Sequence, residues 1–199
     1  MTKAHDPDSP LRQTAWGDES MRFDIERPAY VFAAAIVGVD ALDDIRDVMR
    51  PLRVAGNKLH WRDLDPRQRT SVVNAIAEIE ALHVAVIATP MDPRRQERAR
   101  AKCIQRMLAF LAEMGVGPVV LEQRTESLNA RDQKLITRLR GTRSLPASLT
   151  VGFGQPSKEP LLWIPDIVAG AVGDELADPT TTWASALSVC LETISIDLD

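Results

Sequence analysis

The chain has 199 residues, of which 45% are hydrophobic and 26% charged, as is typical of one folded domain with a substantial core. The formal net charge of −4 excludes a global positive field that would attract nucleic acid, so any phosphate contact must come from local basic groups. Two cysteines far apart in sequence, Cys103 and Cys190, exclude a disulfide framework and a thiolate zinc site, and they favour a reducing cytoplasm.

We expect no targeting signal at the beginning of this sequence. Its first ten residues are polar and lack the apolar segment of a signal peptide, and we expect residues 1–10 to be a flexible tail. No apolar run reaches the roughly 18 residues that a membrane span requires. We therefore expect residues 11–199 to form a single domain that works in the cytoplasm.

The first part of this domain is expected to contain a strand pair. The two strands fall at residues 11–19 and 29–38 and are joined by a charged loop over 21–28. The second strand is almost wholly apolar, as is typical of a central strand that is buried on both faces. The pattern predicts a wide antiparallel hairpin.

Helix signals follow the hairpin. Asp40 is placed to cap a helix over 40–49, and Asp65-Pro66 joins an N-cap residue to a proline at the first turn of a second helix. An irregular segment lies between the two helices. We therefore interpret residues 40–82 as a helical insertion before the third strand.

Strands and helices alternate in the rest of the chain. Gly115 and Gly141 are placed to end two of the helices. An early hairpin followed by strand–helix units predicts an α/β fold with a mixed five-stranded sheet flanked by helices, in the order found in ribonuclease-H-like proteins. The remaining strands are expected at 83–89, 116–122 and 148–153, and the remaining helices at 92–114, 126–140, 161–175 and 181–193.

Carboxylates lie at the ends of several predicted elements. Asp18 is near the end of the first strand, Glu122 ends the fourth, and Asp166 begins a helix among apolar neighbours. In the predicted sheet the first and fourth strands are parallel neighbours, so their acids emerge at one edge. Oxygen-only clusters suit Mg²⁺ or Mn²⁺, and two such ions can catalyse phosphodiester cleavage. We expect the metal ligands to be Asp18, Glu19, Glu122 and Asp166.

Two further residues are candidates for the chemistry. Asp132 shares a helix face with apolar residues and therefore requires a partner. His60 lies in the irregular segment and could act as an acid–base group or contact phosphate, although a packed loop histidine is an equal alternative. For each acid, a helix cap, an arginine partner or simple exposure is the alternative. The predicted catalytic residues are Asp18, Glu122, Asp166, Asp132 and His60.

Local basic groups supply the candidate contacts to nucleic acid. Lys58 lies near His60, Arg124 lies beside Glu122, and Arg131 belongs to a basic stripe on a predicted helix. Such stripes can follow phosphates, but a solvated helix face is the more frequent explanation. The two stripes comprise Arg95, Arg98, Lys102 and Arg106 on one helix, and Arg131, Lys134 and Arg138 on another.

Four short motifs occur between residues 14 and 175: Asp18-Glu19-Ser20, Lys58-Leu59-His60-Trp61, Leu121-Glu122-Gln123-Arg124 and Ile164-Pro165-Asp166-Ile167-Val168-Ala169-Gly170-Ala171. Together they resemble the motifs of the DUF3800 family. This family often has Gly where the chain has Met21, and Leu-Gln-Leu-Ala-Asp where it has Trp163-Ile164-Pro165 before the acid. The resemblance implies a ribonuclease-H-like fold and a metal-dependent nuclease, with no firm substrate.

These observations predict a divalent-metal-dependent nuclease that uses Mg²⁺ or Mn²⁺ on DNA or RNA. The alternative is a non-catalytic module of the same fold that binds nucleic acid or a protein partner. A metal ion between Asp18 and Asp166 would favour the first. Arginine or lysine paired to those acids would favour the second. The segment 58–63 is expected to lie beside the acidic edge of the sheet.

Overall fold

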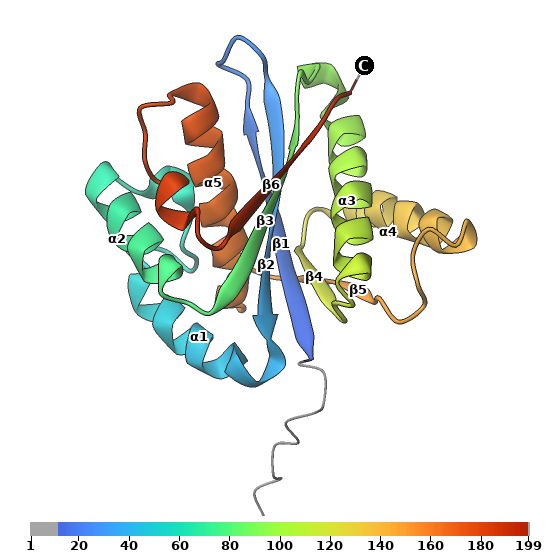
Figure 1. Ribbon diagram of the computed structural model, residues 1–199, viewed down its shortest axis with the longest axis horizontal. Coiled ribbons are helices and arrows are strands. Elements are labelled where there is room, and N and C mark those ends of the chain that lie inside the picture. Colours follow the sequence, from blue (N-terminus) through green and yellow to red (C-terminus); the bar gives the residue numbers. More distant parts are fainter. Residues whose placement is uncertain (1–11, 199) are drawn as a thin grey trace, which may run out of the picture.

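The computed structural model describes residues 12–198, so the tail predicted at 1–10 lies outside the described residues. A central sheet runs through this part of the chain, with helices on both faces (Figure 1). Its strands are β1 (Gln13–Arg22), β2 (Ala29–Gly38), β3 (Ala81–Ala88), β4 (Val119–Glu122), β5 (Val151–Gly154) and β6 (Leu191–Ile196). Its helices are α1 (Leu42–Met49), α2 (Pro66–Ala77), α3 (Gln96–Glu113), α4 (Glu126–Gly141) and α5 (Trp163–Ala177).

The sheet has six strands in the order β5-β4-β1-β2-β3-β6. β2 pairs antiparallel with both β1 and β3, whereas β1–β4, β4–β5 and β3–β6 are parallel. The predicted α/β class, the mixed sheet and the parallel pairing of the first and fourth strands are confirmed. The parallel pairing matters most for function, because it places the ends of β1 and β4 side by side.

The helix predicted at 181–193 is wrong, and with it the count of five strands. A short 3-10 turn, Ser185–Leu187, occupies this region, and Leu191–Ile196 forms β6 alongside β3. Thr193, Ile194 and Ile196 are β-branched and favour an extended chain. Pairing with β6 also satisfies the backbone groups that β3 would otherwise leave open at the edge of the sheet.

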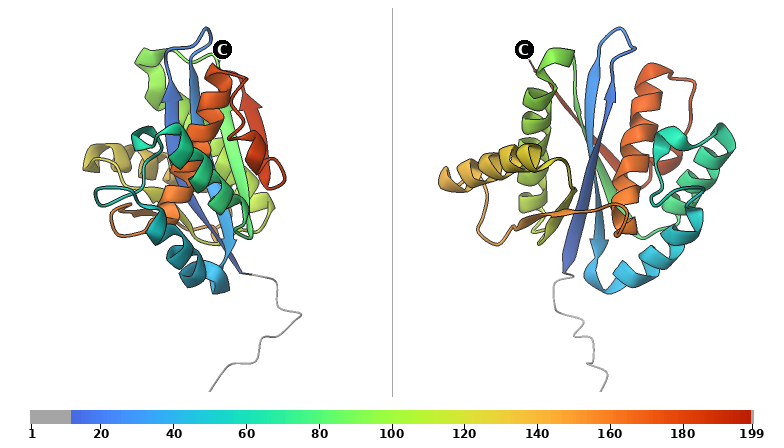
Figure 2. Two further views of the ribbon diagram at one scale, coloured as in Figure 1. Left: turned by 90° about the vertical axis from the view of Figure 1, so that its left-hand side faces the viewer. Right: turned by 180° about the vertical axis from the view of Figure 1, so that it is seen from behind.

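Two helical layers enclose the sheet. α1, α2 and α5 cover one face, and α3 and α4 cover the other (Figure 2). Because successive side chains of a strand point to opposite faces, β1 contributes Trp16 to the core under α5 and Ala15 to the core under α3. The same alternation sends Asp18 toward the α5 face and Glu19 toward the α3 face.

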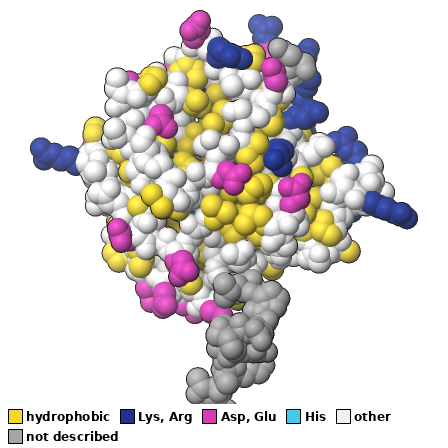
Figure 3. Space-filling view, in the orientation of Figure 1, with side chains coloured by type: hydrophobic (Ala, Val, Ile, Leu, Met, Phe, Trp, Pro, Cys, Tyr) yellow, Lys and Arg dark blue, Asp and Glu magenta, His cyan; other side chains and the backbone are white. Residues whose placement is uncertain are grey.

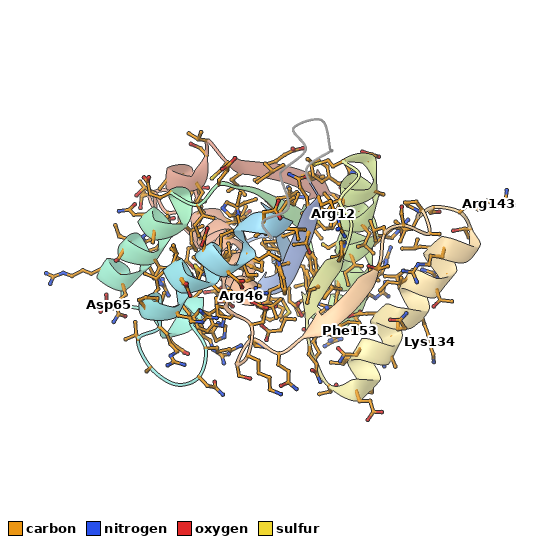
Figure 4. The ribbon with its side chains drawn as sticks, turned by 90° about the horizontal axis from the view of Figure 1, so that it is seen from below. Arg12, Arg46, Asp65, Lys134, Arg143 and Phe153 are labelled. Atoms are coloured by element: carbon orange, nitrogen blue, oxygen red, sulfur yellow. The ribbon has the colours of Figure 1, made fainter. Side chains whose placement is uncertain are left out.

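The segment 40–82, interpreted as an insertion, contains α1 and α2. At the start of α2, Asp65 accepts hydrogen bonds from the backbone N–H groups of Arg67 and Gln68, each at 2.9 Å, with Pro66 in the first turn. Arg46 of α1, labelled in Figure 4, donates to Glu159 before α5, with 2.8 Å between Nη2 and Oε2. The first contact caps α2, and the second joins α1 to the segment before α5, within the helical layer that covers this face of the sheet.

Among residues 12–198, no helix combines the length and the apolarity that crossing a bilayer would require.

Candidate functional site

A cavity of about 430 Å³ opens where the end of β1 meets β4 and α5. Asp18 of β1, Glu122 of β4 and Asp166 of α5 all line it. The fold explains this meeting, because β1 and β4 are parallel neighbours and α5 packs across β1 and β2. The structure therefore brings together, on one face of the sheet, the three acids that the sequence singles out most strongly.

Asp18 is the least compensated of these acids. Its side chain is 7% exposed, and its Oδ1 accepts a hydrogen bond from the backbone N–H of Glu19 at 2.8 Å. Burial, followed by the negative charges of Glu19, Glu122 and Asp166, raises the pKa of the Asp18 carboxyl well above its usual value. Within the described part of the chain, no lysine, arginine or histidine forms an ion pair with it. This position therefore favours a positive charge or a proton.

Asp166 holds the segment that leads into a short 3-10 turn, Trp61–Asp63. Its Oδ2 accepts a hydrogen bond from the backbone N–H of Trp61 at 2.7 Å. Its Oδ1 lies 2.8 Å from Nδ1 of His60, close enough for an ion pair although the alignment does not make a hydrogen bond. The expectation that segment 58–63 lies beside the acidic edge is confirmed, and His60 lines the cavity.

Glu122 has a basic partner. The Nζ atom of Lys58 lies 3.3 Å from its Oε1, and both side chains are partly buried. Lys58 thus comes from the same segment as His60 and reaches the end of β4. This lysine pairs with Glu122, whereas no lysine or arginine among residues 12–198 forms an ion pair with Asp18 or Asp166.

Trp61 anchors this segment, and its partners are residues that sequence reasoning missed. Its Nε1 donates to Asp174 Oδ2 at 3.1 Å, and the Arg69 guanidinium lies 4.7 Å from its ring centroid. A Cβ on Gly170 would meet Trp61 Cγ at 2.2 Å, so only glycine admits the indole against α5. A sequence signal existed, because Asp174, like Asp166, is an acid within an almost wholly buried helix.

Asp174 itself carries two arginines. Arg69 Nη1 lies 2.8 Å from its Oδ2, and Arg22 at the end of β1 pairs with its Oδ1. Both arginines line the cavity together with Lys58. The wall next to the three acids is therefore basic, although each of these cations already has a carboxylate partner.

The structure does not bring Asp132 into this cavity. Asp132 is a buried residue of α4, where Arg100 Nη2 is 2.9 Å and Arg124 Nη2 is 3.3 Å from its carboxylate oxygens. Glu19 borders the cavity, but its carboxylate pairs with Arg100. Asp132 as a catalytic residue and Glu19 as a metal ligand are corrected accordingly: the partner that these buried acids require is arginine.

The basic residues proposed for nucleic acid also divide between the two faces. Lys58 lines the cavity, whereas Arg124 is held by Glu97, with 2.7 Å between Nη1 and Oε1, and by Asp132. Arg131 is exposed on α4, as is Lys134, which lies on the outer side of that helix in Figure 4. Figure 3 shows dark blue side chains gathered on the side of α3 and α4. These stripes do not line the cavity, and they have the character of solvated helix faces.

The donor atoms fit one mode of metal binding and not another. Within residues 12–198, no three histidine, cysteine or acidic side chains stand close enough together to hold a metal ion. Mg²⁺, however, commonly takes only one or two protein carboxylates and completes its shell with water and substrate phosphates. Asp18, buried and without a cation, together with Asp166 or Glu122 fits this second mode.

Comparison with known proteins assigns no family. No protein-family model matches the chain, and no curated protein matches it significantly. The resemblance to DUF3800 therefore rests on its four motifs alone, and each of these supplies at least one residue to the wall of the cavity.

Proposed function

We propose that the chain is a ribonuclease-H-like nuclease related to DUF3800, which hydrolyses phosphodiesters with Mg²⁺ or Mn²⁺. One observation carries the proposal: buried Asp18 meets Glu122 and Asp166 in a single cavity, and no cationic side chain of residues 12–198 pairs with it. Uncompensated buried carboxylates are unfavourable, and proteins retain them where a ligand relieves the charge. The all-oxygen donor set favours a hard divalent cation.

The residues of the cavity divide the work. Asp18 and Asp166 would hold the cation, which when bound supplies the Lewis-acid charge that stabilises a phosphate under attack. His60, 2.8 Å from Asp166, is placed to accept a proton from the attacking water or to give one to the leaving oxygen. Lys58 can release Glu122 and bind a phosphate oxygen instead, because its ammonium group is carried on a long, flexible side chain.

Two further features accompany this proposal. The substrate would be DNA or RNA, since a phosphodiester is the group that a metal ion, a lysine and a histidine together can cleave. The site of action would be the cytoplasm. Cys103 and Cys190 are both free thiols, which agrees with a reducing compartment.

A second candidate is a non-catalytic module that uses the same surface to bind nucleic acid or a protein. The ion pair between Lys58 and Glu122 favours it, because a lysine neutralises one acid without any metal. His60 also takes up a place beside an acid, with its Nδ1 2.8 Å from Asp166 Oδ1. The two candidates differ in whether Asp18 recruits a cation.

Thermal melts with EDTA and with Mn²⁺ separate these candidates. We expect saturating Mn²⁺ to raise the Tm of the wild type by about 5–10 °C, since a ligand that binds only the folded chain stabilises it by mass action. Asp18→Asn should remove this shift. Asp63→Asn is the matched control, because Asp63 is 71% exposed and does not line the cavity.

The result decides which candidate stands. Equal Mn²⁺ shifts in the wild type and Asp18→Asn would remove Asp18 from a metal site. No Mn²⁺ shift in the wild type, together with no cleavage of a labelled oligonucleotide, would favour the non-catalytic module.

A further inference from the structure

The tip of the β1–β2 hairpin forms one lip of the cavity. This hairpin extends beyond the helices at the upper end of the sheet in Figure 1. Met21 and Phe23 line the cavity and yet are 38% and 47% exposed. Among the large exposed hydrophobic side chains of residues 12–198, Phe23 is the only aromatic one. The mouth of the cavity therefore carries a half-exposed aromatic side chain.

A loosely held cation lies on the same mouth. Arg62 lines the cavity with a side chain that is 78% exposed, and its Nε is 3.8 Å from the exposed carboxylate of Asp63. Exposed pairs of this kind contribute little to stability. Arg22 and Arg69, by contrast, are bound to Asp174 deeper in the wall. Of these three arginines, Arg62 can therefore leave its carboxylate partner most easily and bind an incoming anion.

The depth of the acids limits the shape of the ligand. Asp18 and Asp166 are each 7% exposed, so a phosphate must descend below the lip to approach them. A cavity of about 430 Å³ has the size of a small-molecule site and admits about one nucleotide, not a double helix. In a duplex the bases are stacked on each other, so they cannot also lie on a protein ring without being unstacked. An unpaired strand has free base faces and a flexible backbone.

From these three observations we infer that the cavity mouth selects single-stranded nucleic acid, with a base stacked on Phe23 and an adjacent phosphate held by Arg62. The inference rests on the proposed function for the identity of the anion and adds the strandedness of the substrate. Stacking on an aromatic ring accepts any base, so this mouth favours single strands without reading their sequence.

Fluorescence anisotropy with a labelled 12-nucleotide strand tests this inference. The probes are a mixed-sequence DNA strand, its RNA equivalent, and the same DNA strand annealed to its complement, all in EDTA to prevent cleavage. We expect the single strands to bind more tightly than the duplex. Phe23→Ala and Phe23→Leu should weaken single-strand binding by roughly tenfold, whereas Phe23→Trp should retain it. Phe23→Leu matters most, because leucine keeps the apolar area but has no ring face.

The charged half of the mouth has its own variant and control. Arg62→Ala should weaken binding and reduce the salt dependence of the affinity by about one phosphate contact. Arg67→Ala, at an exposed position of α2 away from the cavity, and Val189→Ala, at a fully exposed residue, should bind as the wild type does. Thermal melts of each variant verify folding, and Phe23 is exposed enough for its replacement to be tolerated.

The inference and the proposed nuclease can fail separately. Duplex binding as tight as single-strand binding, unchanged affinity in Phe23→Leu, or no strand binding at all would overturn the inference, even if Mn²⁺ stabilises the protein. Loss of strand binding in Phe23→Ala and Phe23→Leu would support it, even if Mn²⁺ neither binds nor supports cleavage. In that case the same mouth would belong to the binding module.

Discussion

Two adjacent acids of β1 lie in opposite surroundings. Glu19 points to the α3 face, where it pairs with Arg100. Arg100 also pairs with Asp132, and Arg124 links Asp132 to Glu97. Asp18 points to the α5 face, where the negative charges of Glu122 and Asp166 add to the effect of burial and raise the pKa of its carboxyl. Adjacent residues of one strand therefore belong to two different clusters. On the α3 face the carboxylates are paired with arginines, which we call the closed network, whereas on the α5 face Asp18 lies among other carboxylates, which we call the open cluster.

The two clusters differ in how their charges respond to burial. Burial opposes the charge of Arg100, yet Glu19, Tyr30 and Asp132 raise the pKa of its guanidinium, so it stays charged. For Asp18, burial and its neighbours act in the same direction and raise the pKa of an acid. The α3 face is thus satisfied by the chain itself. The α5 face retains an unfavourable charge that an external ligand can relieve, which is how functional sites commonly differ from structural ones.

The largest effect is expected when an arginine is removed from the network on the α3 face. Arg100 is 1% exposed, and Arg100→Met would leave buried Asp132 and partly buried Glu19 with reduced compensation. Removing one partner of a buried ion network typically costs about 3–5 kcal/mol. We expect a fall of this size in the free energy of unfolding measured by chemical denaturation.

Arg98→Met is the control for that measurement. Arg98 lies on the exposed side of the same helix, and its replacement should change the free energy of unfolding by less than about 0.5 kcal/mol. A loss below about 1 kcal/mol in Arg100→Met would mean that the network does not stabilise the α3 face, and the contrast between the two faces would disappear.

A second variant tests the contact between Gly170 and Trp61, which positions the segment beside the acids of the cavity. In Gly170→Ala the new Cβ would overlap Trp61, which must move away from α5 and take His60 and Lys58 with it. Such overpacking costs about 1–3 kcal/mol. We expect lower stability and an altered tryptophan fluorescence. Gly141→Ala has nothing within 4 Å of the new Cβ and should be neutral or slightly stabilising. Equal behaviour of the two variants would show that Trp61 is not held by Gly170.

Much of the fold could be predicted from local signals. The apolar run of β2, the Asp65 cap and the glycine that follows α3, Gly115 at φ +69°, define their elements without tertiary information. The last strand could not be predicted in this way. The segment 191–196 is short and only partly buried. It forms a strand because its backbone groups pair with those on the edge of β3. That requirement belongs to the assembled sheet.

The acids of the site could be predicted from the sequence, but the partner of each acid could not. Asp18, Glu122 and Asp166 were recognised as acids at element ends, and the parallel pairing of β1 with β4 brings them to one cavity. Asp132 also requires a partner, because it shares a helix face with apolar residues, but this partner, Arg100, lies 32 positions earlier on another helix. An arginine within the buried stripe of α3 was the available clue. Sequence showed which acids require a partner, whereas only the fold distinguishes an arginine from an open cavity.

The last prediction uses the pair of neighbouring acids directly. Asp18→Asn removes the charge that the other carboxylates repel, but it keeps an oxygen that can accept the Glu19 N–H. In EDTA at pH 8 we expect this variant to be more stable than the wild type by on the order of 1 kcal/mol, the size of one close like-charge contact in a highly polar environment. Glu19→Gln is the matched control, because it weakens the pairing with Arg100 and should lower stability.

The pH dependence gives the sign of the effect a second test. The pKa of Asp18 is raised in the folded state, so the folded chain binds the proton more tightly than the unfolded chain does. The destabilisation due to ionised Asp18 is therefore full above the folded pKa and disappears as the pH falls toward the ordinary carboxyl value near 4. Urea denaturation of the wild type and Asp18→Asn should show their difference shrinking between pH 8 and pH 4. A difference that is constant with pH, or an Asp18→Asn variant less stable than the wild type, would show that Asp18 is compensated as Glu19 is. The two faces of β1 would then not differ in kind.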